Sequence, residues 1–223
     1  MNDIETKWSK VDEYIYNLLV QSDEVLEKAL EANEEAGLPS IDVAPNQGKM
    51  LYLLARIKGA QRILEMGTLG GYSTIWLARA LPENGRLVSL ELDPIHAKVA
   101  QSNIDRAGLS ACVEIQVGEA LDSLDKLVEQ YEIFDMIFID ADKVNNPHYL
   151  QYALQFSRPG TLIIFDNVVR EGEIIDGDST DSSIQATRTL FQMIAKEPRL
   201  VSTAIQTVGG KGYDGFAFAL VTE

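Results

Sequence analysis

Three side chains with oxygen ligands stand at the ends of two apolar runs in this sequence. Asp140 closes the run that begins at Phe134, and the pair Asp166-Asn167 closes the run that begins at Thr161. Carboxylate and amide oxygens are hard ligands that suit Mg²⁺, Mn²⁺ or Ca²⁺, and they disfavour zinc or copper. Acids at the end of an apolar strand are costly to bury unless they are paired or metal-bound. The pattern predicts a divalent-cation site; the alternative is a set of solvated strand caps or salt-bridged acids.

A glycine-rich turn follows the first apolar run, in the segment Glu65-Met-Gly-Thr-Leu-Gly-Gly-Tyr-Ser73. Glycines at such a turn let the backbone approach a ligand closely. The spacing of Gly67, Gly70 and Gly71 differs from the G-x-G-x-x-G fingerprint of dinucleotide-binding folds. Together with Glu91 at the end of the next run, the turn resembles motif I and the following acidic position of S-adenosylmethionine-dependent methyltransferases. The alternative is a purely structural tight turn.

Glu91 and Glu65 are expected to bind different parts of the cofactor. A carboxylate at the carboxyl end of the second strand, where Glu91 stands, can accept hydrogen bonds from both hydroxyls of a ribose. Glu65 can receive the cationic amino group of the cofactor. A sulfonium cofactor carries no phosphate, so an acidic site suits it. For Glu91 the alternative is a surface acid at a strand end.

Short apolar runs alternate with helical stretches from residue 62 onward. The runs predict parallel strands at 62–66, 86–91, 112–117, 134–140 and 161–165. The stretches between them predict crossover helices at 72–81, 94–107, 120–129 and 147–156. This alternation is typical of a doubly wound α/β fold. Such a fold gathers the carboxyl ends of its strands at one edge, so we expect the glycine turn and the acids to meet there.

Helices are expected before this α/β part of the chain, and a hairpin after it. Apolar residues recur at helical spacing over 6–34, as one broken helix or two, and Pro45 opens another helix that ends near Gly59. Towards the C-terminus, the sequence predicts a helix at 182–196 and strands at 201–208 and 216–222 around a loop at 209–215. We predict one domain over 1–223, with an N-terminal helical addition at 1–60 and an α/β core at 61–223.

Further motifs lie at and between the predicted strands. Beside the glycine turn, they are Gly118-Glu-Ala-Leu121, Ile139-Asp-Ala-Asp-Lys143, Arg158-Pro-Gly160 and the Asp166-Asn167 pair. Jointly they resemble the cation-dependent O-methyltransferases, a family that contains caffeoyl-CoA and catechol O-methyltransferases and small bacterial relatives. The likeness covers roughly residues 38 to 223. It implies a Rossmann-like class I methyltransferase fold, with a mostly parallel seven-stranded sheet and an antiparallel C-terminal hairpin, and it also implies a homodimer.

The resemblance also implies roles for individual residues. The metal ligands would be Asp140, Asp166 and Asn167, and Lys143 would be the general base beside Asp140. The S-adenosylmethionine site would be lined by Val43, Glu65, Gly67, Thr68, Ser73, Glu91, Ala120 and Asp140.

The expected acceptor is a small aromatic with two adjacent hydroxyls, of catechol, phenylpropanoid or flavonoid type. Mg²⁺, or Mn²⁺ or Ca²⁺ in its place, would lower the pKa of a hydroxyl and hold it beside the cofactor methyl. Lys143 would take the proton; the alternative is an exposed lysine that pairs with Asp142. Arg170-Glu171 and Asn146 depart from the residues of plant caffeoyl-CoA enzymes, where a Trp-Asn pair and an aromatic are found. These departures weaken the expectation of a coenzyme-A thioester as substrate.

Composition excludes several other classes of protein. The 223 residues carry 19 Lys and Arg against 34 Asp and Glu, a formal net charge of −15. Neutralising nucleic-acid phosphates needs clustered cations, so a bulk nucleic-acid binder is not expected. The single cysteine cannot form an internal disulfide, and no apolar run approaches the length of a membrane span. With an N-terminus that lacks a secretory pattern, we expect a cytoplasmic protein away from membranes.

Other functions stay open from the sequence alone. A nicotinamide-dependent (NAD) oxidoreductase would share the fold and the strand-end acid, although the glycine spacing and the oxygen ligands speak against it. A tRNA methyltransferase acting on a hydroxylated base would use the same site, with a cationic patch near Arg170, Arg188 and Lys211. A non-catalytic binding module is the remaining class. The only histidines, His96 and His148, stand in helix-like segments and give little support to a histidine-centred triad.

Overall fold

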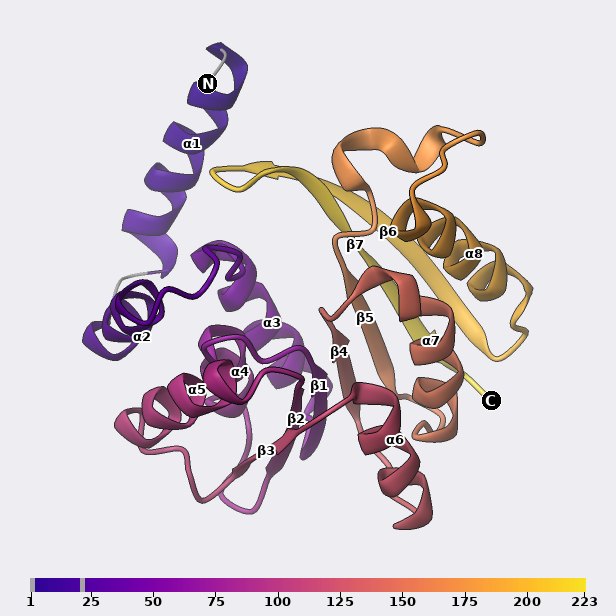
Figure 1. Ribbon diagram of the computed structural model, residues 1–223, viewed down its shortest axis with the longest axis horizontal. Helices are drawn as coiled ribbons and strands as arrows, with labels where there is room; N and C mark the ends of the chain where they lie inside the picture. The colour runs from indigo at the N-terminus through magenta and orange to yellow at the C-terminus, as the bar shows by residue number, and fades with distance from the viewer. Residues whose placement is uncertain (1–2, 21–22) are drawn as a thin grey trace.

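A seven-stranded sheet forms the centre of the protein, which a computed structural model describes over residues 3–20 and 23–223 (Figure 1). The strands are ordered β3-β2-β1-β4-β5-β7-β6 along the sheet. Their bounds are β1 Arg62–Met66, β2 Arg86–Glu91, β3 Val113–Val117, β4 Met136–Ile139, β5 Leu162–Asp166, β6 Leu200–Gly209 and β7 Gly212–Val221. The first five are parallel, whereas β7 runs antiparallel to both β5 and β6. This confirms the predicted Rossmann-like fold with its antiparallel C-terminal hairpin.

Helices cover both faces of the parallel strands (Figure 1). One face carries α2 Glu24–Glu35, α3 Pro45–Lys58, α4 Tyr72–Ala78 and α5 Pro94–Arg106. The other carries α6 Ala120–Glu129, α7 Asn146–Gln155 and α8 Ser182–Lys196. Parallel strands covered on both faces need apolar side chains on both, and Ile63 and Leu64 on β1 are accordingly both fully buried. The alternation of apolar runs and helical stretches therefore follows from the layered packing.

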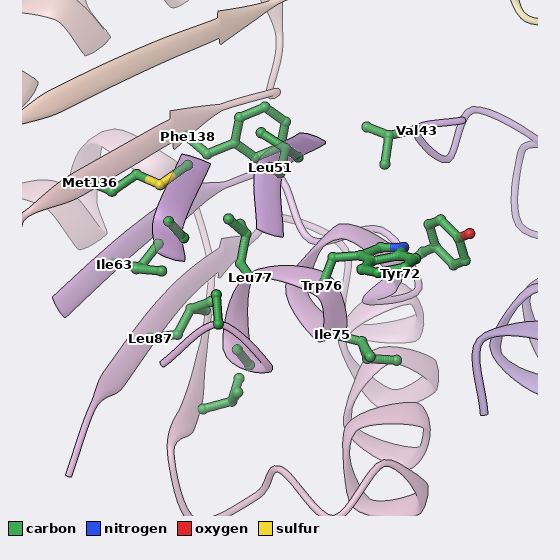
Figure 2. Close-up of a cluster of buried hydrophobic side chains, with 14 of the residues drawn as sticks. Val43, Leu51, Ile63, Tyr72, Ile75, Trp76, Leu77, Leu87, Met136 and Phe138 are labelled. Atoms are coloured by element: carbon green, nitrogen blue, oxygen red, sulfur yellow. The ribbon is translucent and has the colours of Figure 1, made fainter. Parts of the chain in front are cut away.

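The packing of α3 on α4 holds the N-terminal helices against the element that follows the glycine turn. Trp76 and Tyr52 meet edge to face, with their ring centroids 6.3 Å apart. A Cβ atom at Gly48 would lie 2.3 Å from the Trp76 ring, so this position of α3 has room only for glycine. Val43, which precedes α3, and Leu51, which lies within it, belong to the same buried cluster as Trp76 and Tyr72 (Figure 2). The segment before α3 is thereby placed beside the glycine turn.

Local sequence signals explain where the helices around the site begin. Asp93 accepts a hydrogen bond of 2.7 Å from the Ile95 backbone N–H, and Pro94 takes the first position of α5. Gly71 precedes α4 in the left-handed conformation, with φ of 84°. Glycine adopts that conformation without strain, so the glycine turn leads directly into the helix.

The C-terminal hairpin differs from the prediction. The expected loop at 209–215 is wrong, because β6 extends to Gly209 and β7 begins at Gly212, which leaves only Gly210 and Lys211 at the turn. Glycines are poor strand formers, and those at the start of β7 concealed it in the sequence. The longer β7 carries Asp214 into the sheet, in register with Thr207.

The N-terminal segment forms separate helices, as expected. These are α1 Asp3–Ile15, the short π-helix η1 Tyr16–Val20 and α2; part of the predicted stretch 6–34 lies outside the described residues. Figure 1 shows α1 beside the tip of the hairpin. There the Asp12 carboxylate accepts hydrogen bonds from the Gly210 backbone N–H (2.8 Å) and the Asn46 side-chain amide (2.9 Å). Within 3–20 and 23–223, no helix combines the length and apolar character required for a membrane span.

Candidate active site

Two neighbouring pockets lie where the parallel strands end. The first, here called the turn pocket, surrounds the glycine turn and the ends of β2 and β4 and has a volume of about 620 Å³. The second, the acid pocket, lies between the ends of β5 and β7 and the N-terminal segment, with a volume of about 640 Å³. Residues common to both linings are Ile41, Asp42, Val43, Asp140, Asn167 and Arg170. The pockets therefore share a wall, and Asp140 stands in it.

Nearly all of the residues predicted to line a cofactor site are brought together at the turn pocket. They are Val43, Gly67, Thr68, Ser73, Glu91, Ala120 and Asp140. The backbone at Gly67 has φ of 95°, and a Cβ atom there would lie 2.2 Å from the Asp140 carbonyl oxygen. The Asp140 N–H donates to the Met66 carbonyl at 2.8 Å, which ties the end of β4 to the end of β1. Glycine at position 67 is thus required by the close approach of the two strand ends.

Glu91 holds the glycine turn in place. Its Oε2 accepts backbone hydrogen bonds from Thr68 (3.1 Å) and Leu69 (2.8 Å), while Oε1 accepts one from Asp93 (2.9 Å). The residue is 8% exposed and lines the turn pocket. The alternative of a surface strand-end acid is wrong. Each carboxylate oxygen has two lone pairs, so Oε1 can still accept a bond from a ligand hydroxyl.

Glu65 is the one predicted cofactor residue that does not reach a pocket. Its side chain is fully buried and accepts hydrogen bonds from the hydroxyls of Ser73 (2.6 Å), Thr74 (2.5 Å) and Ser89 (2.7 Å). Burial raises the pKa of Glu65 to about 7, against the opposing effect of these hydroxyls. Ser73, which lines the turn pocket, stands between Glu65 and any ligand there.

The three predicted oxygen ligands gather at the acid pocket. Asp140, Asp166 and Asn167 all line it, although they stand at the ends of two different strands. Asp166 is 3% exposed, and its Oδ1 accepts a hydrogen bond from the Asn167 backbone N–H at 2.7 Å. Burial, and then the nearby Asp140 carboxylate, raise the pKa of Asp166 well above its usual range, against the opposing effect of Lys143.

Lys143 pairs with the predicted partner Asp140. Its Nζ donates to Asp140 Oδ1 at 2.7 Å, and its side chain is 10% exposed. The alternative pairing with Asp142 is wrong, because the Asp142 carboxylate accepts the Tyr149 hydroxyl at 2.5 Å and the Asn145 amide at 2.7 Å. Lys143 stands in the short 3-10 helix η2 Lys143–Asn145 and lines the turn pocket. It therefore lies beside the wall that the two pockets share.

The residues present fit a divalent cation. Two carboxylates lie close enough for one to raise the pKa of the other, and the charge that offsets them comes from Lys143. A divalent ion beside Asp140 and Asp166 would remove that repulsion, and their oxygen donors suit Mg²⁺. Among the described residues, no group of three or more acidic, histidine or cysteine side chains could hold a metal ion, so the candidate set depends on the Asn167 amide.

Sequence reasoning missed two further residues of the acid pocket. Asp42 lines both pockets and accepts a hydrogen bond of 2.9 Å from the Asn33 side chain, and burial raises its pKa. Its position comes from the docking of the N-terminal segment, for which the chain has no local signal. Asp214 lines the acid pocket and accepts bonds from the backbone after β5. The Asp214-Gly215 pair before an apolar run is the signal that could have found it.

The chain is similar to known proteins over nearly its whole length. Residues 17–216 match the O-methyltransferase family. A catechol O-methyltransferase of Niastella koreensis is 53% identical over 215 residues, covering 96% of this chain and 97% of that protein. The structure of a Bacillus cereus O-methyltransferase in complex with S-adenosylhomocysteine (SAH) has a TM-score of 0.96 at 56% identity, over 97% of this chain and 99% of that one. The O-methyltransferase TomG of Streptomyces achromogenes, solved with S-adenosylmethionine, has a TM-score of 0.96 at 48% identity over the whole of both chains.

Proposed function

The chain belongs to the S-adenosylmethionine-dependent O-methyltransferases, and we propose that it methylates a hydroxyl of a small catechol-type aromatic with the help of Mg²⁺ or a similar divalent cation. The observation that supports this proposal is the shared wall of the two pockets. Asp140 and Asn167 line both, so a cofactor in the turn pocket and an acceptor in the acid pocket would meet beside the candidate metal ligands. Methyl transfer needs the cofactor and the acceptor side by side, because most of the catalytic help comes from holding the two reacting groups in line.

The turn pocket is the proposed cofactor site. Glu91 would bind one ribose hydroxyl through Oε1, while Gly67 and Thr68 let the cofactor lie against the turn. Glu65 would interact with the cofactor's amino group indirectly, through Ser73, because the Ser73 hydroxyl donates a hydrogen bond to Glu65. Val43, Ala120 and Asp140 would complete the pocket. Family membership sets aside the NAD-dependent oxidoreductase.

Asp140, Asp166 and Asn167 are the proposed metal ligands. A divalent cation bound there would supply Lewis acidity and a fixed position for two adjacent oxygens of the acceptor. Lys143 would accept the hydroxyl proton at Nζ. The Nζ atom lies 2.7 Å from Asp140 Oδ1, beside the proposed metal ligands.

The acid pocket suits a small aromatic acceptor. Phe216, Met50 and Ile184 give its lining apolar surface, while Asp42 and Asp214 add charge. Among the charged residues of the lining, acids outnumber the cations Arg170 and Lys211. A phosphate-bearing substrate such as tRNA would be repelled by that charge, so we place the tRNA alternative second.

We also propose a homodimer that forms through the hairpin. Val201, Ile205 and Leu220 lie on the same face of the hairpin as Phe216, yet they are 64%, 43% and 42% exposed. A row of apolar side chains in water on a sheet edge marks an association surface. We likewise propose a cytoplasmic location and a single domain, with an N-terminal helical addition at 1–60 and an α/β core at 61–223.

The test of the proposed function is transfer of labelled methyl from S-adenosylmethionine across a panel of acceptors. We expect product with catechols and flavonoids that carry adjacent hydroxyls, and none with their mono-hydroxyl analogues or with bulk tRNA. EDTA and Asp140→Ala should each abolish transfer, and excess Mg²⁺ should restore only the EDTA-treated sample. Asp122→Ala, an exposed acid on α6, is the matched control. Transfer that survives both EDTA and Asp140→Ala would refute the metal assignment.

A further inference from the structure

The backbone that follows β5 adopts an unusual conformation at the acid pocket. Asn167, Arg170 and Glu171 have φ values of 55°, 55° and 56°, in the left-handed region, which asparagine tolerates but arginine and glutamate rarely adopt. Arg170 opens the 3-10 helix η3 Arg170–Ile175, and both Asn167 and Arg170 line the two pockets. A strained backbone persists only where its surroundings hold it. The segment 167–171, here called the left-handed turn, therefore needs an anchor.

Asp214 provides that anchor from the opposite strand. Its Oδ1 accepts three backbone hydrogen bonds, each of 2.9 Å, from the N–H groups of Val169, Arg170 and Gly215. Pairing of β7 with β5 places Phe216 opposite Asp166, and the Val168 N–H continues the pairing with a bond of 3.1 Å to the Gly215 carbonyl. Asp214 is thus brought beside the left-handed turn by the register of the hairpin.

The contacts of Asp214 indicate an anchor rather than a further metal ligand. Three N–H donors already occupy Oδ1, the oxygen for which the structure gives partners. Hydrogen bonds from backbone N–H groups to a carboxylate are among the stronger ones in proteins. Gly215 fits the same arrangement, because a Cβ atom there would lie 2.2 Å from the Ile205 carbonyl oxygen and 2.6 Å from the Val169 side chain. The packing leaves the left-handed turn little room to move away from Asp214.

We propose that Asp214 is a positioning residue that holds the left-handed turn and thereby keeps Asn167 beside Asp166 for cation binding. The inference rests on the proposed function, since it assigns Asn167 to the metal site. Asp214 acts through the backbone of Val169 and Arg170, with no contact to the ion. Loss of its carboxylate lets the turn relax from its left-handed conformation, which carries the Asn167 side chain away from Asp140 and Asp166.

The experiment measures Mn²⁺ affinity by electron paramagnetic resonance, with SAH affinity by calorimetry as the test of folding. We expect Asp214→Ala to weaken Mn²⁺ binding at least tenfold while SAH binding changes less than about threefold. Asp214→Asn retains an acceptor oxygen without the charge, so we expect its affinity for Mn²⁺ to fall about threefold. Asp176→Ala is the matched control, because this exposed acid of the same loop accepts the Asp178 N–H rather than a backbone group of the left-handed turn. The control should bind Mn²⁺ as the wild type does.

A second readout separates positioning from a simple loss of charge. Amide hydrogen exchange at Val169 and Arg170 should speed up at least tenfold in Asp214→Ala, and less in Asp214→Asn. If Asp214→Ala does not fold, Asp214→Asn decides, and wild-type exchange and Mn²⁺ affinity in that variant would overturn the proposal. Unchanged amide exchange in a folded Asp214→Ala would also overturn the proposal. Mn²⁺ binding by the wild-type protein would still support the proposed function in that case. A wild-type protein that binds no Mn²⁺ would refute the metal assignment, and this inference with it.

Discussion

Lys143 Nζ lies 2.7 Å from Asp140 Oδ1, at the wall that separates the turn pocket from the acid pocket. Lys143 pairs with Asp140 and not with the neighbouring Asp142, because the Asp142 carboxylate already accepts hydrogen bonds from the Tyr149 hydroxyl and the Asn145 amide. Lys143 is therefore free to face the residue that the proposed mechanism makes a metal ligand. A proton acceptor and a metal ligand three positions apart on one short segment can serve the same hydroxyl.

Replacement of Lys143 tests its role as a base. Lys143→Met should lower kcat at least ~100-fold, the usual contribution of general-base catalysis, while SAH affinity stays within about threefold. Lys143→Arg should be equally inactive, because arginine retains the cation beside Asp140 but cannot accept a proton. Lys126→Met, on an exposed part of α6, is the control. Steady-state kinetics decide the matter, and an active Lys143→Arg enzyme would mean that only the positive charge is needed.

Replacement of Asp166 should stabilise the metal-free protein and remove metal binding. In EDTA, Asp166→Asn removes a buried carboxylate that burial and Asp140 disfavour, so we expect a stabilisation of about 1 kcal/mol or more, or ~2–4 °C in Tm. The same variant should lose the rise in Tm that Mg²⁺ gives to the wild type. Scanning calorimetry with and without Mg²⁺ measures both effects, with the exposed Asp178→Asn as control. A lower Tm in EDTA, or a full response to Mg²⁺, contradicts the assignment.

Burial of Glu65 should make the stability of the ligand-free protein depend on pH. Its pKa is about 7 in the folded protein against an ordinary 4.5, so the folded state retains a proton that the unfolded chain releases. Its contribution to stability is complete below pH 4.5 and is lost as the pH rises to about 7. The difference in unfolding free energy between wild type and Glu65→Gln should fall by up to about 3 kcal/mol across this window. Urea denaturation at a series of pH values measures it, with exposed Glu83→Gln as control.

The proposed dimer depends on the face of the hairpin that carries Ile205. Ile205→Lys places a charge among the exposed apolar side chains of that face, so we expect the variant to be monomeric at concentrations where the wild type is a dimer. Ser202→Lys, on the other face of the same strand, should leave the dimer intact. Light scattering coupled to size-exclusion chromatography distinguishes the two masses. A wild-type monomer, or a dimeric Ile205→Lys protein, counts against this interface.

The sequence by itself determined the fold and most of the two pockets. Parallel strands covered on both faces require apolar runs, and the runs at 62–66 and 86–91 coincide with β1 and β2. Parallel strands also end at one edge, so a glycine turn after β1 and acids after β4 and β5 could be expected to meet. The apolar runs and the rule that parallel strands end at one edge were enough to predict these features, because they depend only on the local chain and on neighbouring strands.

Tertiary structure alone decided how deep each polar group lies and which partner it takes. Glu65 lies buried beneath Ser73, where Ser89 on β2 supplies a further hydroxyl to its carboxylate, and the sequence around Glu65 does not contain that information. Asp42 and Asp214 reach the acid pocket through the docking of the N-terminal segment and the register of the hairpin. Burial and pairing depend on elements far apart in the chain, and the free energy of an ionisable side chain is set by such distant neighbours.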